Sequence, residues 1–521
     1  MDQQQSTHHQ HDHDDKSDDR AATRVRSRCI RWCRLGHTSA MKIPSIASLV
    51  CSLSLVWPVL SPASGGPADL PPGPQPPEAT KAFARELLKG LVEINSTHSF
   101  GSTAAAEWVA SRLRTAGFPA EDLTLIAPPD QPDKGNLVIR LHGQEKGRAL
   151  LFISHLDVVE ARKEDWSVDP FLLTEQDGYL YGRGTYDIKG DDAALVASLL
   201  RLKTEGFIPD RDIVVALTAD EETFGKFDGV DWLMREHRDL IDAGLILNPD
   251  AGGGMSSGNR RLYMGLETSE KSYVTFGLEV TNKGGHSSLP EPDNAIYRLA
   301  AGLGRIAKLD FPVRLSPTTR AYFAALSKTE SGQLSRDLMK MTTATGELDR
   351  AATRRLETSM FYNAMLHTTC VATMLSGGHA ENALPQRAGA TIQCRMLPDD
   401  SQADVQARLT KALADPAIRI SVTTPAIPGP ESIVTPTLKR KFEVVVGSMW
   451  PGVPVVPDMD AGASDSKFTR AAGIPTFGIT GIFTDIDDNR AHGKDERIAV
   501  SGFYEDVEFT YRLMKAFSAR D

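Results

Sequence analysis

Apolar residues after Glu78 gather into short, almost continuous runs that are separated by amphipathic stretches. The runs are rich in Val, Ile and Leu, which is typical of strands buried on both faces of a sheet. They cover residues 136–141, 149–154, 212–218 and 244–248. Two intervening stretches have helical periodicity: one carries Phe83, Leu87, Leu88, Leu91 and Ile94 on one face, and the other covers residues 189–205. Because strand and helix alternate, we predict a doubly wound α/β sheet.

The pattern changes at Ser272, where apolar and polar residues begin to alternate as in a half-exposed strand. From there the predicted order is strand, helix, strand, strand, helix, strand, which is the order of a ferredoxin-like α+β domain. These elements cover residues 272–281, 292–308, 368–375, 389–397, 401–414 and 418–423. A polar, mainly helical segment at about 311–366 interrupts this order.

The α/β character returns after residue 428, with a strand at 476–480 and a closing helix around 499–516. We therefore predict one large domain made of residues 78–271 and 429–521. A smaller domain, residues 272–428, is inserted into it and contains the extra helical segment.

The first 77 residues carry no signal of a packed fold. Residues 1–40 include the low-complexity string HHQHDHDD, and we interpret them as a disordered extension or a start codon assigned too early. Residues 41–64 have the layout of a secretory signal peptide, which predicts a secreted or periplasmic protein. A membrane anchor is the alternative, but the two prolines and four serines in the apolar stretch disfavour a spanning helix. Residues 65–77 are interpreted as a Pro-rich linker, and no stable membrane insertion is expected after signal cleavage.

The chain has 521 residues, enough for two or three domains. Its formal net charge of -10 argues against nucleic acid as a partner, because phosphate binding needs a basic face. Five cysteines in this length do not form a disulfide framework.

Acidic residues and a histidine follow three of the predicted buried strands. His155 and Asp157 come at the end of the second run, Glu221 and Glu222 follow the third, and Asp250 follows the fourth. In an open α/β sheet, ligands bind outside the carboxyl ends of the strands, so these side chains can converge.

A glycine-rich loop at 182–187 adds Asp187 to this group. The loop lacks the spacing of a dinucleotide-binding motif, which disfavours a nucleotide. Taken singly, each group can also be explained without a ligand. His155 and Asp157 could be a histidine bonded to a neighbouring carboxylate, and Glu221 and Glu222 a solvated charge pair. Asp250 could start a turn, and Asp187 could cap a helix. Together they indicate a bound cation, because several buried carboxylates are costly without one. Imidazole and carboxylate without thiolate favour zinc, with manganese or cobalt as alternatives.

The strings SHLDVV, GRGTYDIKG, TADEE, NPD, GGHSSLP, ENALP, GASDSKF and AHGKDE occur in this order between Ser154 and Glu496. They resemble the M20 family of metallopeptidases, the glutamate carboxypeptidase, aminoacylase and carnosinase group. The resemblance covers about Glu78 to the C-terminus. It implies a catalytic domain of phosphorylase/hydrolase-like type, and it makes the inserted domain a lid and the candidate contact of a homodimer.

The resemblance also implies two Zn²⁺ ions per subunit. Asp187 would bridge the two ions. His155 and Asp250 would complete one metal site, and Glu222 and His492 would complete the other. The family often has glutamate where Asp250 stands.

Further roles follow from the same resemblance. Asp157 would orient His155 from behind, and Glu221 would be the general base that activates a water shared by the two ions. In the lid, His286 would stabilise the oxyanion, often in the partner subunit's site. Asn382 and Arg395 would hold the substrate carbonyl region and its free carboxylate. Without the resemblance, His286 is equally a turn residue and Arg395 a surface residue of a strand.

Cys370 and Cys394 lie symmetrically about residue 382. An antiparallel hairpin centred there would place them opposite each other. In an oxidising compartment they could form a disulfide, and buried free thiols are the alternative.

Our first hypothesis is an exopeptidase of carboxypeptidase or dipeptidase type that acts on peptides. The alternative is an N-acyl amino-acid amidohydrolase of deacylase or desuccinylase type, since the same metal site serves both. A catalytically inactive binding protein is a remote alternative, because every implied ligand and Glu221 are present. A phosphoesterase is disfavoured because no phosphate clamp is evident.

Overall fold

The computed structural model describes residues 70–144, 147–223, 227–344 and 347–519. All described residues belong to one compact unit. The predicted extension at 1–40, the predicted signal peptide at 41–64 and the start of the predicted linker lie outside the described residues. In the described part, no helix has both the length and the hydrophobicity that a bilayer crossing requires.

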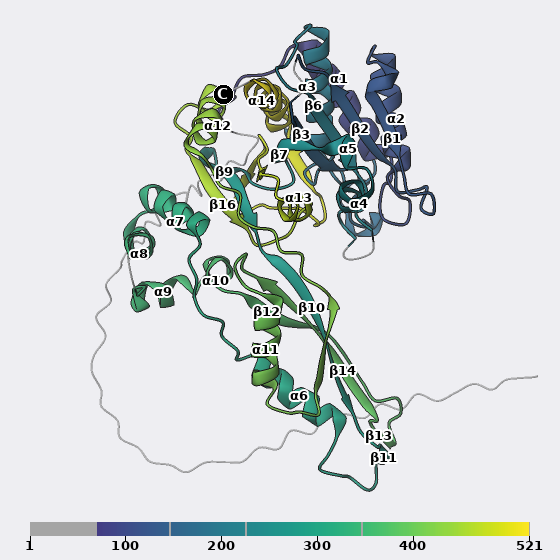
Figure 1. Cartoon of the computed structure of the whole chain (residues 1–521), viewed down its shortest axis with the longest axis vertical. Helices are drawn as coiled ribbons and strands as arrows, with labels where there is room; N and C mark the ends of the chain where they lie inside the picture. Colours follow the sequence, from purple (N-terminus) through teal and green to yellow (C-terminus); the bar gives the residue numbers. More distant parts are fainter. Residues whose placement is uncertain (1–69, 145–146, 224–226, 345–346, 520–521) are drawn as a thin grey trace, which may run out of the picture. The chain divides into compact units, whose positions relative to one another are not determined.

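The four predicted buried runs form neighbouring strands of one large sheet (Figure 1). Its strands lie in the order β1-β2-β6-β3-β7-β17-β9-β8-β18, and β16 pairs with β9. The strands β6 (Ile213–Thr218), β3 (Ala149–His155), β7 (Ala243–Asn248) and β17 (Thr476–Gly478) are mutually parallel. The others are β1 (Leu123–Ile126), β2 (Asn136–Leu141), β8 (Gly253–Ser257), β9 (Arg260–Glu270), β16 (Val455–Asp460) and β18 (Phe483–Asp485). The α/β prediction is confirmed, and the sheet is mixed because β2 runs antiparallel to β6.

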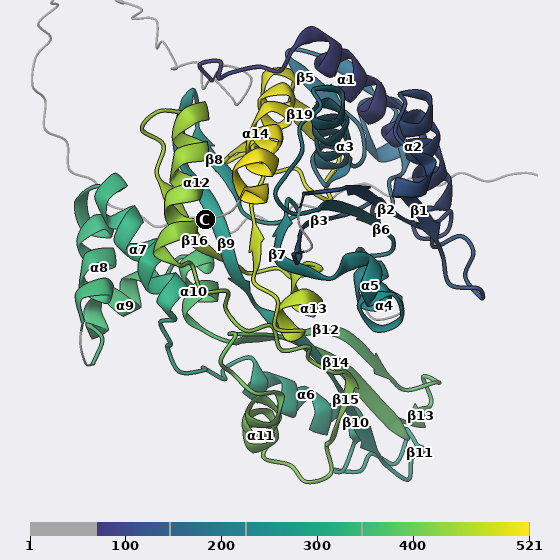
Figure 2. The ribbon, with the colours of Figure 1, turned by 45° about the horizontal axis from the view of Figure 1, so that its top comes forward.

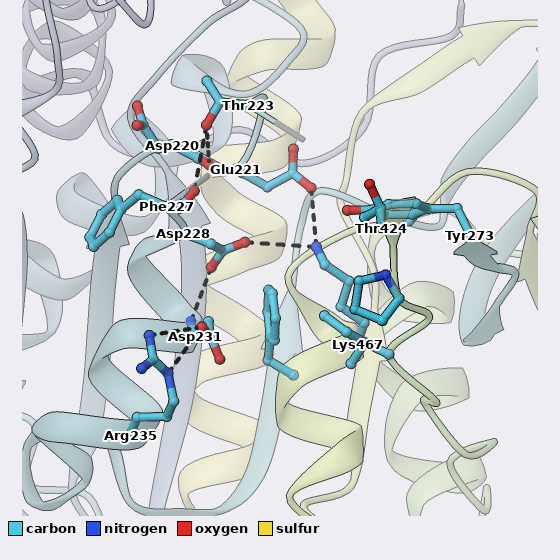
Figure 3. A pocket seen from close by; sticks show the side chains of 14 residues that line it. Asp220, Glu221, Thr223, Phe227, Asp228, Asp231, Arg235, Tyr273, Thr424 and Lys467 are labelled. Atoms are coloured by element: carbon cyan, nitrogen blue, oxygen red, sulfur yellow. Dashed lines mark hydrogen bonds and ion pairs between the residues drawn. The ribbon is translucent and has the colours of Figure 1, made fainter. Parts of the chain in front are cut away.

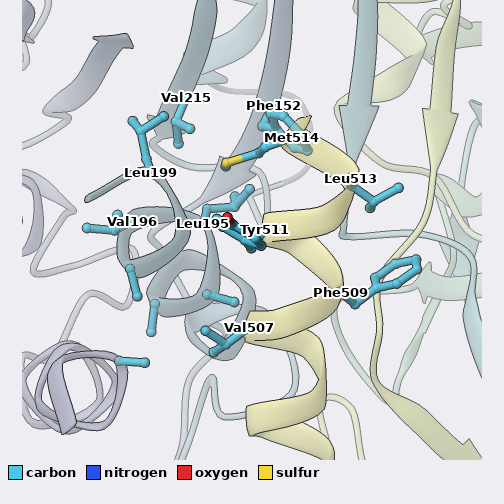
Figure 4. Close-up of a cluster of buried hydrophobic side chains, with 14 of the residues drawn as sticks. Phe152, Leu195, Val196, Leu199, Val215, Val507, Phe509, Tyr511, Leu513 and Met514 are labelled. Carbon is cyan, nitrogen blue, oxygen red and sulfur yellow. The ribbon is translucent and has the colours of Figure 1, made fainter. Parts of the chain in front are cut away.

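Helices cover both faces of this sheet because its central strands are apolar on both. Leu150 and Phe152 of β3 belong to one core with α1 (Glu78–Glu93), α3 (Lys189–Thr204) and α14 (Val500–Ser518), part of which Figure 4 shows. Leu151 and Ile153 belong to a second core with α4 (Gly229–Glu236) and α5 (Arg238–Ile241). Successive side chains of a strand point to opposite faces, which explains this division. Helices α2 (Thr103–Thr115) and α12 (Pro436–Met449) add to the first core, and α13 (Ser466–Ala471) to the second.

The segment predicted as an inserted domain contains a separate antiparallel sheet with the order β12-β14-β10-β15. Its strands are β10 (Ser272–Thr281), β12 (Thr369–Gly377), β14 (Arg387–Met396) and β15 (Arg419–Thr424). Helices α6 (Ala295–Ile306) and α11 (Gln402–Leu413) lie together on one side of it (Figure 2). This chain order and strand order are those of a ferredoxin-like domain, as the alternating pattern predicts.

The extra segment is helical, as predicted, but its helices do not join the core of the four-stranded sheet. It forms α7 (Pro317–Thr329), α8 (Gly332–Thr343), α9 (Arg350–Leu356) and α10 (Met360–Leu366). Tyr322, Phe323 and Leu338 of these helices share a core with Tyr263 of β9 and Met459 of β16. The segment therefore packs on the large sheet although it lies within the inserted domain in sequence.

The remaining strands are short. The strands β4 (Thr174–Gln176), β5 (Tyr179–Tyr181) and β19 (Arg497–Ala499) form a three-stranded sheet, and β11 (Gly285–His286) pairs with β13 (Ala383–Leu384). Cys370 of β12 lies opposite Cys394 of β14, and the two form a disulfide. The hairpin geometry expected from their symmetric placement about residue 382 is therefore present.

Candidate active site

The parallel strands bring the candidate ligands to one edge of the large sheet. His155 is the last residue of β3 and lies opposite Thr218, the last residue of β6. Asp250 follows β7 by two residues. Since parallel strands end at the same edge, residues distant in sequence become neighbours there.

Two clusters of potential ligands share Asp187. In the first, His155 Nε2 lies 3.3 Å from Asp187 Oδ1 and 3.6 Å from Asp250 Oδ1. In the second, His492 Nε2 lies 3.1 Å from Asp187 Oδ2 and 2.9 Å from Glu222 Oε1. Each oxygen of Asp187 thus faces a different cluster, which is the arrangement that a bridging carboxylate needs.

The donors fit a pair of divalent cations. His155 Nε2 is buried and has no hydrogen-bond partner among the described residues, although two carboxylates lie near it. Its Nδ1 donates to the main-chain oxygen of Asp157 at 3.0 Å, because a carbonyl can only accept. The lone pair of Nε2 is therefore directed at the cluster. Three carboxylates and two imidazoles form a nitrogen and oxygen set that zinc accepts.

Burial and mutual repulsion perturb these acids. Burial raises the pKa of Asp250 to about 7, although the His155 ring opposes the shift. Burial would lower the pKa of His155, but the carboxylates of Asp187 and Asp250 raise it well above the usual value. Burial would raise the pKa of Asp187, and the two histidines lower it instead. A cation at each cluster would relieve this repulsion.

The carboxylate of Asp157 holds the turn that follows β6. Its two oxygens accept the main-chain N–H groups of Glu221 and Glu222, each at 3.1 Å. Asp157 Oδ1 lies 3.9 Å from His155 Nδ1, too far for a hydrogen bond. It is thus the main-chain carbonyl of Asp157, and not its side chain, that orients His155.

The adjacent side chains of Glu221 and Glu222 point to different partners. The preceding residue, Asp220, has a φ of 60°, and its carboxylate accepts a hydrogen bond from Lys134 Nζ at 3.0 Å. Glu222 faces His492, whereas Glu221 lies 3.8 Å from Lys467 Nζ (Figure 3). Because one glutamate faces the ligands and the other does not, the turn can divide metal binding and proton transfer between them.

Glu221 also lines a cavity of about 250 Å³. Apolar side chains form much of its wall: Phe227, Tyr273, Pro425, Ile427 and Phe468. Asp228 and Lys467 lie in the same wall, 3.8 Å apart (Figure 3). Tyr273 belongs to the four-stranded sheet and Phe468 belongs to α13, which packs on the large sheet, so both sheets contribute residues to this cavity.

The three lid residues named from sequence separate into two places. Arg395 lies opposite Tyr273 in the four-stranded sheet, with its guanidinium 5.4 Å from the centre of the Tyr273 ring. Arg395 therefore lies near the cavity that Tyr273 lines. His286 lies in β11, beside Asn382, whose carbonyl accepts the N–H of Ser287. Eight further residues of β10, a length of roughly 27 Å, separate Tyr273 from the end of the strand that leads to β11, and His286 and Asn382 do not join the metal-ligand clusters of their own chain.

Sequence reasoning did not select Lys467, Lys134 or the buried pair of Arg183 and Glu496, whose side chains are joined at 2.5 Å. Lys467 lies in GASDSKF, Arg183 in GRGTYDIKG and Glu496 in AHGKDE, so the motifs contained three of these four residues. Only burial and contacts distinguish them from solvent-exposed charges.

A mixed α/β fold that gathers histidines and carboxylates at one edge of its sheet is the arrangement expected of a metal-dependent hydrolase. The chain belongs to Peptidase family M20/M25/M40, whose sequence profile matches residues 151–516. Its relatives include peptidases and amidohydrolases, and the predicted family is confirmed.

Individual relatives have different activities in their names. The human N-fatty-acyl-amino acid synthase/hydrolase PM20D1 is 25% identical over 497 residues, which cover 91% of this chain and 97% of the relative. The probable carboxypeptidase S-like 2 of Dictyostelium discoideum is 28% identical over 385 residues, 71% of this chain and 72% of the relative. The crystal structure of the M20 family metallo-carboxypeptidase Sso-CP2 from Sulfolobus solfataricus superposes with a TM-score of 0.62 at 17% identity, covering 84% of this chain and 99% of that one.

Proposed function

We propose that this protein is a two-zinc hydrolase that cleaves the amide bond before a C-terminal amino acid, as a carboxypeptidase or dipeptidase does. One observation carries the proposal: the two oxygens of Asp187 each face a separate histidine–carboxylate pair. A single-metal site does not need a carboxylate whose two oxygens face two separate sets of ligands. We assign His155 and Asp250 to one ion, and Glu222 and His492 to the other.

Glu221 is the proposed general base. Two bound zinc ions would lower the pKa of water and polarise the substrate carbonyl. Glu221 is next to a ligand but faces the cavity, so it can accept a proton from the attacking water and return it to the leaving amine. Asp157 supports both glutamates through their main-chain N–H groups.

Arg395 is the proposed partner of the free carboxylate of the substrate. It lies beside Tyr273, which lines the cavity, and the negative charge of Glu221 favours the protonated form of its guanidinium. A guanidinium can bind both oxygens of a carboxylate, which favours substrates with a free C-terminus.

His286 and Asn382 are proposed to act in the site of a partner subunit, since β10 carries them away from their own. A homodimer through the lid would supply them. The edge strand β12 has exposed apolar residues suited to such a contact, among them Met374 and Leu375, which are 69% and 71% exposed. Unpaired edge strands are ready to pair with a second chain.

An N-acyl amino-acid hydrolase is the second candidate, and a specific observation favours it. The cavity beside Glu221 has apolar side chains in part of its wall, among them Phe227, Ile427 and Phe468, which can contact an acyl chain as readily as a peptide side chain. The human relative, which matches over most of both chains, is named for an activity on N-fatty-acyl amino acids. Both candidates place a free amino-acid carboxylate at Arg395 and differ only in the acyl side. Secretion or export to the periplasm, directed by residues 41–64, remains part of the proposal.

The test is a panel of substrates with one shared leaving amino acid. Zinc-loaded protein is given dipeptides, longer peptides and N-acyl amino acids of increasing chain length that all release phenylalanine. Faster release from peptides supports the carboxypeptidase, and faster release from acyl chains supports the second candidate. If no amide substrate is cleaved with zinc, manganese or cobalt while two metal ions are bound, the proposed function is wrong.

A further inference from the structure

We propose that the buried ion pair of Arg183 and Glu496 positions the metal ion held by Glu222 and His492. This inference rests on the proposed two-metal function. Neither residue belongs to the two ligand clusters or to the lining of the cavity beside Glu221. They would act through the ligands and not on the substrate.

The pair lies where two chain segments diverge. The strands β5 and β19 are antiparallel, and Tyr181 lies opposite Arg497 at one end of their ladder. Just beyond it, the N–H of Gly182 donates to the oxygen of Glu496 at 3.1 Å. From here one segment leads to Asp187 and the other leads back to His492. Arg183 and Glu496 are thus the side chains nearest to the point of divergence.

Each member of the pair contacts the main chain near one ligand. Arg183 Nη1 donates to Glu496 Oε2 at 2.5 Å, and both side chains are buried, with at most 3% exposed. Glu496 Oε1 accepts the N–H of Asp187 at 3.1 Å and that of Tyr186 at 2.8 Å. Arg183 Nη2 donates to the oxygens of Gly493 at 3.0 Å and His492 at 3.4 Å. The pair therefore connects the shared ligand to a ligand of the second cluster.

The two clusters depend on the pair unequally. His155, in the first cluster, is 2% exposed and is held by the strand pairing of β3. The side chain of His492 is 53% exposed, and its residue has a φ of 60°, which few residues with a side chain adopt. Because burial does not hold His492, the hydrogen bonds to its main chain have to. Removal of the guanidinium should weaken the second metal site and leave the first intact.

Metal binding tests this inference without a measurement of activity. Chelator-treated protein is titrated with Zn²⁺ by calorimetry, and the bound zinc is counted by elemental analysis after gel filtration. We expect two ions in the unaltered protein. In Arg183→Gln we expect one ion with unchanged affinity and a second bound 10–100-fold more weakly, the usual effect of losing a group that supports a ligand.

The matched control is Arg261→Gln. Arg261 of β9 pairs with Glu505 of α14 at 2.6 Å, and their side chains are 10% and 2% exposed, so its loss also leaves a buried glutamate. This variant should melt at a lower temperature but bind two ions with unchanged affinity. In a His492→Ala background, Arg183→Gln should cause no further loss of zinc affinity.

Other outcomes would overturn the inference. If Arg183→Gln binds both ions as tightly as the unaltered protein, the pair serves only stability. The pair also serves only stability if Arg183→Gln lowers the zinc affinity of the His492→Ala variant further. If Arg183→Gln does not fold, the zinc titration is repeated with Glu496→Gln. This variant keeps an acceptor for the Asp187 N–H but removes the charge of the ion pair. If the unaltered protein binds fewer than two ions, the proposed function fails along with this inference.

Discussion

The disulfide between Cys370 and Cys394 should hold the edge of the four-stranded sheet in place. β12 is an edge strand, and Val371, Met374 and Leu375 on it are all exposed. Little apolar burial therefore opposes the detachment of β12 from β14. We expect the double variant Cys370→Ala/Cys394→Ala to open this strand far more often than the oxidised protein does.

The size of the effect follows from the loop that the disulfide closes. The two cysteines are 24 residues apart in sequence. In the chain-entropy description, closing a loop of this length removes about 3.5 kcal/mol of entropy, as TΔS at 25 °C, from the open state. Without the cross-link the open state gains that freedom, so the open population of β12 should rise roughly 300-fold.

Hydrogen exchange measures this opening directly. Amide exchange in peptides that span β12 is compared between the oxidised protein and the double variant, and peptides from β3 and β6 serve as the internal reference. Val371→Ala is the matched control, since it changes an exposed side chain on the same strand and should alter protection by no more than about 1 kcal/mol. Equal protection of β12 in the double variant and the oxidised protein would show that strand pairing, and not the cross-link, holds this edge.

Three further predictions concern the site. Glu221→Gln should keep both metal ions by elemental analysis but lose about 10²–10⁴-fold in kcat, because the base is removed and the ligands are not; a loss of zinc would contradict its placement outside the clusters. Arg395→Ala should raise KM for substrates with a free C-terminus by roughly 10–100-fold, as expected for a lost charge-assisted hydrogen bond, and leave C-terminally amidated substrates unaffected; equal effects on both would remove Arg395 from carboxylate binding. In metal-free protein, burial raises the pKa of Asp157 to about 6 and that of Asp250 to about 7, both above the values of an unfolded chain near 4. These two groups then bind more protons in the folded state than in the unfolded chain between about pH 4 and pH 7. Their contribution to stability should therefore be fully present below about pH 4 and should be lost as the pH rises to about 7. Melting curves of chelated and zinc-loaded protein measure this, and a melting temperature of the chelated protein that rises over this pH range would contradict it.

Local patterns predicted much of the fold because strand and helix periodicity are properties of short segments. The run at 149–154 became β3, and the alternation from Ser272 became β10. The surface against which a segment packs is not a local property. The helices at 317–366 illustrate this, since their apolar residues could have faced either sheet and they pack on β9 and β16.

Strand ends also explain how much of the site was predictable. His155 and Asp250 follow buried strands, so the topology of an open sheet directs them to one edge. His492 follows no such rule and was named through the family resemblance alone. The role of Asp157 was only partly foreseen, because the sequence does not specify whether its carbonyl or its carboxylate meets His155.

By itself the sequence determined the residue types, their spacing and the order of the elements, which is enough to identify the family and its candidate ligands. Only the tertiary structure decided which of those residues meet. Glu222 and His492 are 270 residues apart in the chain, yet their side chains lie at 2.9 Å. Such contacts depend on how whole strands and loops pack. The same applies to burial, which separates the pair of Arg183 and Glu496 from the charged residues that remain in solvent.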